Sequence, residues 1–306
     1  MESIKLHVLG GKTSGALESA PSLGKTGMRA DGKLDLRFRM NRGKTTMRMV
    51  EQRPPLKVVR GFELDDGECL AHIHNVSGGV LDGDRLDLRL DVGSNARAQV
   101  TSTGAARIYR SRGDISVQRT HIHIAESGLL EYLPDQLIPF RNSRYRQVTT
   151  VDMAEDAGLF WWETVAPGRQ AHGELFDYDL LQIETEVYAR DRPAVMENVR
   201  LEPGLRSMTS SLRMGPYRHF STFYMIRIGW PQARWLKLES DLQALAVRLT
   251  EVPKVIWGVS TTAAHGLVVR GMSATGQELP SGLLAFWSSA RREIYGRSAV
   301  PPRKVW

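Results

Sequence analysis

Cysteine is almost absent from this sequence. Its 306 residues contain one cysteine, Cys69, so no disulfide can form within the chain. That absence excludes the disulfide-rich class of secreted domains and favours a reducing compartment, which we take to be the cytoplasm. Because a lone cysteine is more often a small core residue than a metal ligand, we predict that Cys69 is buried.

Long apolar segments are also absent. The first 15 residues contain no apolar run of signal-peptide length. The longest charge-free apolar stretch, residues 255–269, is too short to cross a bilayer and contains hydroxyl residues and His265. We therefore expect no membrane-spanning helix.

Charge of one sign is not concentrated anywhere in the chain. The sequence has 41 Lys and Arg against 34 Asp and Glu, a formal net charge of +7, but the basic residues are spread along it. A nucleic-acid-binding arm would cluster them, and a binding platform would interleave them with aromatic residues. The sequence therefore favours no nucleic-acid partner.

The dominant pattern is alternation of apolar and polar side chains. Leu34, Leu36 and Phe38 alternate with charged residues, and residues 86–92 repeat the pattern. Such alternation is typical of strands with one face on a core, and turn signals separate the candidate strands. We predict a mainly β fold in a single domain, residues 34–306. Residues 1–33, rich in Gly, Ser, Lys and Thr, are predicted to be a flexible extension.

Two helices are expected near the C-terminus. The first begins at Ser240, an N-cap residue with Gln243 placed for a capping box, and ends before Pro253. The second follows Pro280 and stops at Gly296. Its apolar stripe consists of Leu283, Trp287, Ala290 and Ile294.

Signatures of catalysis are missing. Gly-Lys-Thr occurs at residues 11–13, 24–26 and 43–45, but none of the three has the earlier glycine that a phosphate-binding loop needs. No Gly-x-Ser-x-Gly nucleophile elbow occurs. We expect neither nucleotide binding by these segments nor nucleophilic catalysis.

Two His-Ile-His tripeptides form the clearest metal-binding pattern. Residues i and i+2 of a strand face the same side, so His72 with His74, or His121 with His123, could offer two imidazoles to one metal ion. With a carboxylate, the first pair could serve a cupin-like, β-rich metal-dependent enzyme. The alternative is that both pairs decorate a solvated strand face, because no third ligand lies at a suitable spacing.

Five segments carry a more specific pattern. They are residues 77–86 (SGGVLDGDRL), 101–111 (TSTGAARIYRS), 130–140 (LEYLPDQLIPF), 168–176 (GRQAHGELF) and 302–306 (PRKVW). In this order they resemble motifs of the urease accessory protein family UreD, also called UreH. The first resembles the family's Pro-Gly-Gly-x-x-Gly-Gly-Asp signature, with Ser77 replacing proline and Asp82 replacing glycine.

This resemblance implies a fold and a role. UreD proteins are similar to one another in having a mostly β, helix-like stack of sheets with two helices. They bridge apo-urease to the accessory proteins UreF and UreG during nickel insertion, and UreG supplies GTP hydrolysis. The resemblance therefore implies a urease maturation scaffold that is not an enzyme, with nickel in transit and no tightly bound cofactor.

The resemblance also implies residues for a nickel passage. Several oxygen ligands in series suit an ion that is held weakly and released. The family's acidic passage positions, and one basic position beside them, fall on Glu63, Asp84, Glu163, Glu197 and Arg107.

A partner surface is the last feature that the resemblance implies. A docking surface exposes apolar side chains before the partner covers them. Trp287 in the second helix and Trp306 in the tail are the candidates, with ordinary core packing as the alternative for Trp287.

Overall fold

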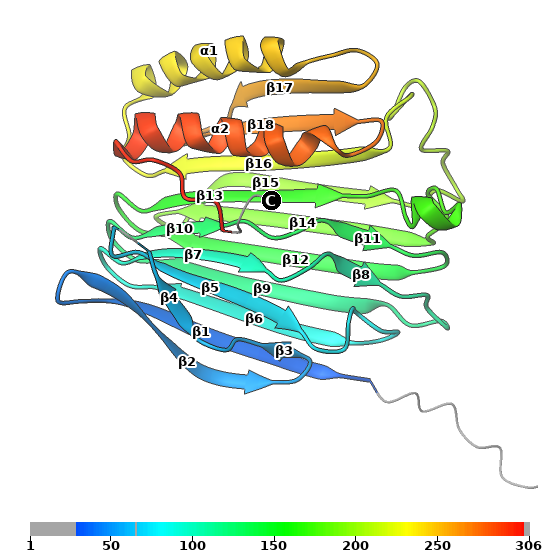
Figure 1. The fold of residues 1–306 in the computed structure, drawn as a ribbon, viewed down its shortest axis with the longest axis horizontal. Coiled ribbons are helices and arrows are strands. Elements are labelled where there is room, and N and C mark those ends of the chain that lie inside the picture. Colours follow the sequence, from blue (N-terminus) through cyan, green and yellow to red (C-terminus); the bar gives the residue numbers. More distant parts are fainter. Residues whose placement is uncertain (1–28, 65, 303–306) are drawn as a thin grey trace, which may run out of the picture.

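Two β-sheets dominate the computed structural model, which describes residues 29–64 and 66–302 (Figure 1). The seven-stranded sheet has the strand order β15-β14-β12-β9-β6-β1-β2. Its strands are β1 (Asp31–Asn41), β2 (Lys44–Arg53), β6 (Arg85–Val92), β9 (Ser116–Ile124), β12 (Arg144–Met153), β14 (Leu180–Ala189) and β15 (Arg192–Leu201).

The eleven-stranded sheet has the main order β17-β18-β16-β13-β10-β7-β5-β3, with three short strands paired beside it. The strands of the main order are β3 (Leu56–Lys57), β5 (Cys69–Asn75), β7 (Arg97–Ser102), β10 (Leu129–Tyr132), β13 (Gly158–Val165), β16 (His219–Arg227), β17 (Val255–Thr261) and β18 (Gly266–Ser273). The short strands are β4 (Gly61–Glu63), β8 (Ala106–Ile108) and β11 (Leu137–Pro139).

The long strands alternate between the two sheets along the chain. The chain passes from β5 to β6, β7 to β9, β10 to β12 and β13 to β14, and each pass forms one coil of a solenoid. Corresponding strands of successive coils pair in parallel. The coils begin at Cys69, Arg97, Leu129 and Gly158, so their lengths differ and no fixed repeat is visible in the sequence.

This topology confirms the predicted mainly β stack of sheets with two C-terminal helices. It also corrects the cupin-like alternative, because a cupin is an antiparallel jelly roll, whereas the coils of this chain stack in parallel. The first strand begins at Asp31, so Asp31, Gly32 and Lys33 of the predicted extension belong to the sheet. Residues 1–28 lie outside the described part of the chain.

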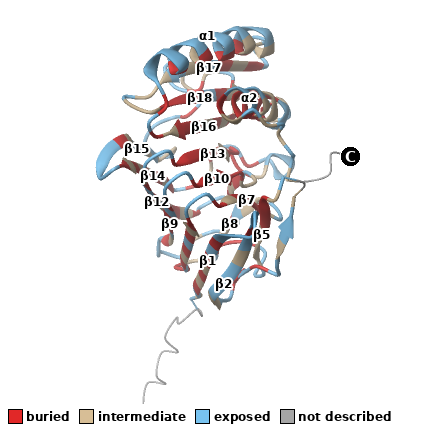
Figure 2. Ribbon diagram, turned by 90° about the vertical axis from the view of Figure 1, so that its left-hand side faces the viewer, coloured by how far each residue is buried: buried red, intermediate tan, exposed pale blue. Residues whose placement is uncertain are grey.

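Two hydrophobic cores cover the two faces of the eleven-stranded sheet (Figure 2). One core lies between the sheets, and the other lies beneath helices α1 (Gln232–Leu249) and α2 (Glu278–Tyr295). On β13, Leu159 and Trp161 enter the first core, while Phe160 and Trp162 enter the second. A strand buried on both faces is a continuous apolar run rather than an alternating one, as β13 shows.

Each helix ends where the sequence predicted but begins earlier than predicted. Helix α2 ends at Tyr295, and Gly296 follows with a left-handed φ of 65°, which confirms the predicted stop. Helix α1 begins at Gln232, so Ser240 lies within the helix and is not its N-cap. Trp235 and Leu238 are the first buried residues of the helix. Because they pack on the core before Ser240, the helix extends further toward the N-terminus than predicted.

The remaining helical element is a single 3-10 turn, η1 (Gln170–His172), between β13 and β14. In the described part of the chain, no helix combines the length and the apolar character needed to cross a membrane.

Candidate functional site

A cavity of about 330 Å³ lies between the two sheets. Its wall is built from segments that are far apart in the sequence: Gly78-Gly79, residues 101–107 and parts of residues 132–137. Residues of β9, β12 and β13 also line it, together with apolar residues of neighbouring strands such as Leu88 and Ile183. The first three segments belong to three of the five family-like motifs, so the fold brings these motifs together around one space.

Glycine residues allow the chain to close around the outer end of the cavity. A Cβ atom on Gly79 would lie 2.5 Å from the carbonyl oxygen of Arg107, so a larger residue does not fit there. Gly78 has a left-handed φ of 76°. The exposed lining residues, which form the mouth, include Gly78, Thr103, Gly104 and Arg107. The predicted lining residue Arg107 therefore borders the cavity at its mouth.

Glu163 on β13 lies at the inner end of a series of polar side chains. The Tyr145 hydroxyl lies 3.3 Å from the side-chain oxygens of both Gln118 and Gln147, and Gln147 Nε2 donates a hydrogen bond to Glu163 Oε1. Burial raises the pKa of Glu163 to about 8, although the Gln147 hydrogen bond opposes this shift. The cavity therefore borders a carboxyl group that is largely protonated at neutral pH.

Glu197 lies on β15, the last strand of the seven-stranded sheet. Its Oε2 accepts hydrogen bonds from the Tyr224 hydroxyl on β16 at 2.5 Å and from Arg270 Nη2 on β18 at 2.9 Å. Burial and the neighbouring Glu197 raise the pKa of Tyr224. The charge of Glu197 also contributes to the raised pKa of Glu163, so these two predicted passage residues lie within electrostatic range of each other.

Of the four acidic residues predicted for the passage, only Glu163 lines the cavity, and Asp84 and Glu63 also have partners of their own. Asp84 is fully buried, and its carboxylate accepts hydrogen bonds from the backbone amides of Ala30 at 2.9 Å and Leu81 at 2.8 Å. It therefore ties the start of β1 to the turn before β6. Glu63 is exposed on β4 and pairs with Lys44 at 2.7 Å. Asp84 therefore holds backbone amides and Glu63 faces solvent, and the passage role of both residues stays a prediction.

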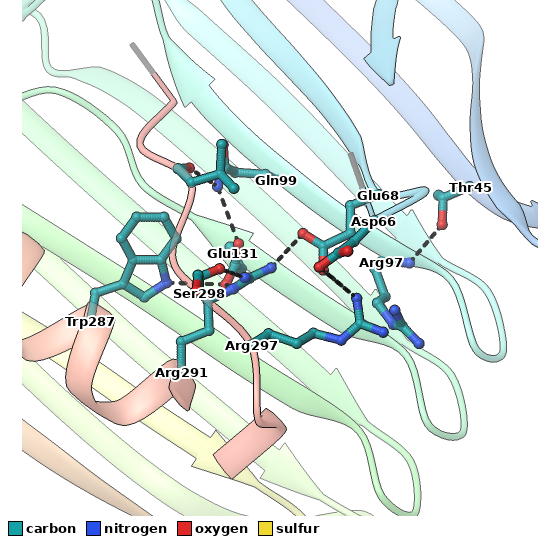
Figure 3. Close-up of polar contacts among 11 residues, drawn as sticks. Thr45, Asp66, Glu68, Arg97, Gln99, Glu131, Trp287, Arg291, Arg297 and Ser298 are labelled. Atoms are coloured by element: carbon teal, nitrogen blue, oxygen red, sulfur yellow. Dashed lines mark hydrogen bonds and ion pairs between the residues drawn. The ribbon is translucent and has the colours of Figure 1, made fainter. Parts of the chain in front are cut away.

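A buried ion-pair cluster beneath α2 is a feature that the sequence did not predict (Figure 3). Arg291 of α2, only 1% exposed, lies between Glu131 of β10 and Glu68. Arg291 Nε lies 2.7 Å from Glu131 Oε1, and the other side of the guanidinium group bonds to Glu68. Glu131 also accepts hydrogen bonds from Trp287 at 3.0 Å and from Gln99 at 3.2 Å. Burial raises the pKa of Glu131, and the charge of Arg291 opposes this shift.

The segment after α2 extends this anchor along the sheet. Arg297 pairs with Asp66 at 3.1 Å, and Gln99 Nε2 donates a hydrogen bond to the carbonyl oxygen of Val300 at 3.0 Å. Two sequence signals could have found the cluster. One is a glutamate inside the apolar run LLEYL, and the other is an arginine beside the apolar stripe of a helix.

Trp287 is part of the core rather than of the surface. Its side chain is fully buried and packs edge-on against Trp162, with the ring centroids 6.1 Å apart. The predicted surface position of Trp287 is therefore corrected. Its indole nitrogen bonds to Glu131, and its ring packs within the second core. Trp306 lies outside the described residues.

The two His-Ile-His pairs do not form a common site. His72 and His74 lie on β5 in the eleven-stranded sheet, whereas His121 and His123 lie on β9 in the seven-stranded sheet. Among the residues that the structure describes, no three His, Cys, Asp or Glu side chains are grouped to hold a metal ion. Cys69 is buried, as predicted, and burial raises the pKa of its thiol to about 11.

These features define a class of protein: a β-solenoid that encloses a cavity and carries two C-terminal helices. A family model described as UreD urease accessory protein matches residues 30–306. The chain is 43% identical over 279 residues to the urease accessory protein UreD of Herpetosiphon aurantiacus, covering 91% of this chain and 97% of that protein. It is 31% identical over 277 residues to UreD of Bacillus sp. strain TB-90, covering 90% and 100%.

The chain therefore belongs to the UreD family of urease accessory proteins. This membership supports a role in urease maturation.

Proposed function

We propose that this protein is a cytoplasmic scaffold for urease maturation, which bridges apo-urease to UreF and UreG. In this proposal nickel passes through the cavity toward the urease active site and is not retained. The chain has no reaction of its own and no tightly bound cofactor. Family membership supports the scaffold role, and the cavity between the sheets supports the passage.

The observation that carries the passage is the lining of the cavity. The polar side chains reaching Glu163 offer carboxyl, amide and hydroxyl oxygens, and none of the described residues that line the cavity is a cysteine or a histidine. Nickel binds nitrogen and sulfur ligands more strongly than such oxygens. The oxygen ligands on the polar part of the wall therefore suit an ion that must move on.

A urease activation assay tests the proposal. Urease structural subunits are co-expressed with UreF, UreG and the remaining accessory proteins, with and without this chain. We expect that urea hydrolysis and the nickel content of urease both depend on the chain. Indifference of both quantities to the chain would overturn the scaffold.

Single substitutions separate the passage from the scaffold. We expect Glu163→Gln and Glu197→Gln to lower the nickel content of urease while UreF still co-purifies with the chain. Glu184→Gln is the matched control for Glu197→Gln, because Glu184 makes a comparable ion pair with Arg146 but, unlike Glu197, does not contribute to the raised pKa of Glu163. If all three variants activate urease equally, the passage is wrong and the scaffold stands.

A further inference from the structure

Arg270 forms an ion pair with the carboxylate of Glu197 at the surface of the protein. Its side chain is 54% exposed, whereas that of Glu197 is 22% exposed. In the described part of the chain, Glu197 is the only ion-pair partner of Arg270. The inference drawn from this pair rests on the proposed passage and concerns how the passage is kept shut.

The strand register places Arg270 in line with the inner end of the cavity. Glu163 on β13 is the cross-strand neighbour of Thr222 on β16, and Thr222 is the neighbour of Arg270 on β18. Neighbouring strands lie about 4.8 Å apart, so the Cα atoms of Glu163 and Arg270 are roughly 10 Å apart. The cavity reaches Glu163 but not Thr222 or Tyr224, so it stops short of Arg270.

The two partners of Glu197 differ in how freely they can move. Tyr224 is buried, and its hydroxyl holds the carboxylate toward the space between the sheets. Arg270 is more than half in water, and such an ion pair adds little to stability. The arginine can therefore swing outward while Tyr224 keeps Glu197 in position.

We propose that Arg270 is the gate of the passage. Its guanidinium group is a tethered cation that occupies Glu197 in the resting protein. A divalent ion coming from Glu163 binds Glu197 only after Arg270 has turned outward into water. The pair thus prevents the isolated chain from exchanging metal ions with the solvent at this end.

Metal binding by the isolated full-length chain tests the gate. Ni²⁺ alone is the probe, and calorimetric titration gives its dissociation constant for each variant. Removing the competing cation in Arg270→Gln should tighten Ni²⁺ binding roughly threefold to fivefold. Arg270→Lys keeps a tethered cation and should stay within about twofold of the wild type.

Two control variants separate competition at Glu197 from a change in net charge. The double variant Arg270→Gln with Glu197→Gln should lose the tightening, because the carboxylate that the gate protects is gone. Arg146→Gln removes one positive charge from a comparable arginine–glutamate pair and should leave Ni²⁺ binding unchanged. Thermal melting of each variant verifies that the fold is retained.

The results distinguish the gate from the passage. Ni²⁺ binding by Arg270→Gln that is unchanged or weaker relative to the wild type overturns the gate. So does the absence of measurable Ni²⁺ binding by both the wild type and Arg270→Gln. Equal tightening by Arg146→Gln also overturns it, because the effect is then one of net charge. If Arg270→Gln tightens binding as expected but urease activation ignores Glu163 and Glu197, the passage fails while Arg270 remains a competitor of metal at Glu197.

Discussion

Asp84 and Glu163 are both enclosed carboxyl groups, but their surroundings give them different tasks. Both carboxylate oxygens of Asp84 accept hydrogen bonds from backbone amides, so this residue fixes the geometry of a turn. Glu163 accepts one side-chain hydrogen bond and borders the cavity, so it keeps room for another partner. At the scale of single residues, the first should matter for stability and the second for cargo.

Replacing Asp84 with alanine should destabilise the fold without changing Ni²⁺ binding. Two partly buried amides lose their acceptors, and each costs about 1–3 kcal/mol, so the free energy of unfolding should fall by roughly 2–6 kcal/mol. Urea denaturation measures this, with Asp87→Ala on the outer face of β6 as the control. A variant of unchanged stability that still fails to activate urease would contradict the structural role.

Glu163 should make the stability of the isolated chain depend on pH. Its native pKa of about 8 lies above the usual value of 4.5, so the native state keeps a proton that the unfolded chain releases. The stabilisation is complete below pH about 4.5 and is lost as pH rises toward 8, by about 1.4 kcal/mol per pH unit. Urea midpoints across this range should slope for the wild type and flatten for Glu163→Gln; parallel curves would show that the group titrates normally.

Helix α2 is attached to the solenoid by charge as well as by apolar contact. Its buried face includes Leu283, Phe286 and Trp287, and Arg291 joins the same face between two carboxylates. A buried carboxylate without a partner is unfavourable, so the helix and the sheet depend on each other.

Arg291→Ala should therefore be strongly destabilising. Breaking a buried ion pair by removing one partner costs about 3–5 kcal/mol, and the free energy of unfolding should fall by a similar amount. Arg292→Ala is the matched control, since Arg292 is the exposed neighbour on the same helix. Equal urea midpoints for the two variants would mean that the cluster contributes nothing to stability.

Local sequence patterns predict best the elements that have one face on the core and the other in solvent. Strands β1 and β6 alternate clearly, and Gly296 marks the end of α2, so the sequence predicts all three. The start of α1 differs from the prediction because Ser240 is a good N-cap in isolation, while the buried contacts of Trp235 override it.

The cavity and the ion cluster could be predicted only in part. The motifs around residues 78, 104 and 134 are visible in the sequence, but their convergence depends on the stacking of coils of unequal length. Arg291 and Glu131 are separated by 160 residues, and no local pattern relates an arginine to so distant a carboxylate.

The passage residues implied by family resemblance have unequal surroundings in the fold. Glu163 borders the cavity, and Glu197 lies within electrostatic range of it. Glu63 and Asp84 are held elsewhere by Lys44 and by backbone amides. A motif identifies a residue but not the direction of its side chain, which is decided by the register of the stacked coils.

The whole molecule is a stack in which each coil contacts its neighbours. Strands β9 and β12 have a paired strand on both sides, whereas β2 is the edge of its sheet. In such a stack the ends open before the middle. Hydrogen–deuterium exchange should therefore be slowest in β9 and β12 and faster in β2; uniform exchange across these strands would indicate a single all-or-none unit.

The long-range ion cluster also bears on how the chain is made. Glu68 and Glu131 are translated 223 and 160 residues before Arg291, so the coils that carry them leave the ribosome while their counter-charge is still unmade. Those coils cannot bury both carboxylates in a dry contact until the last helix arrives. A polypeptide that is interrupted before α2 is therefore left with an uncovered, charged sheet face, a state open to proteolysis and aggregation. Closure of the sheet face that carries Glu68 and Glu131 therefore follows the synthesis of α2.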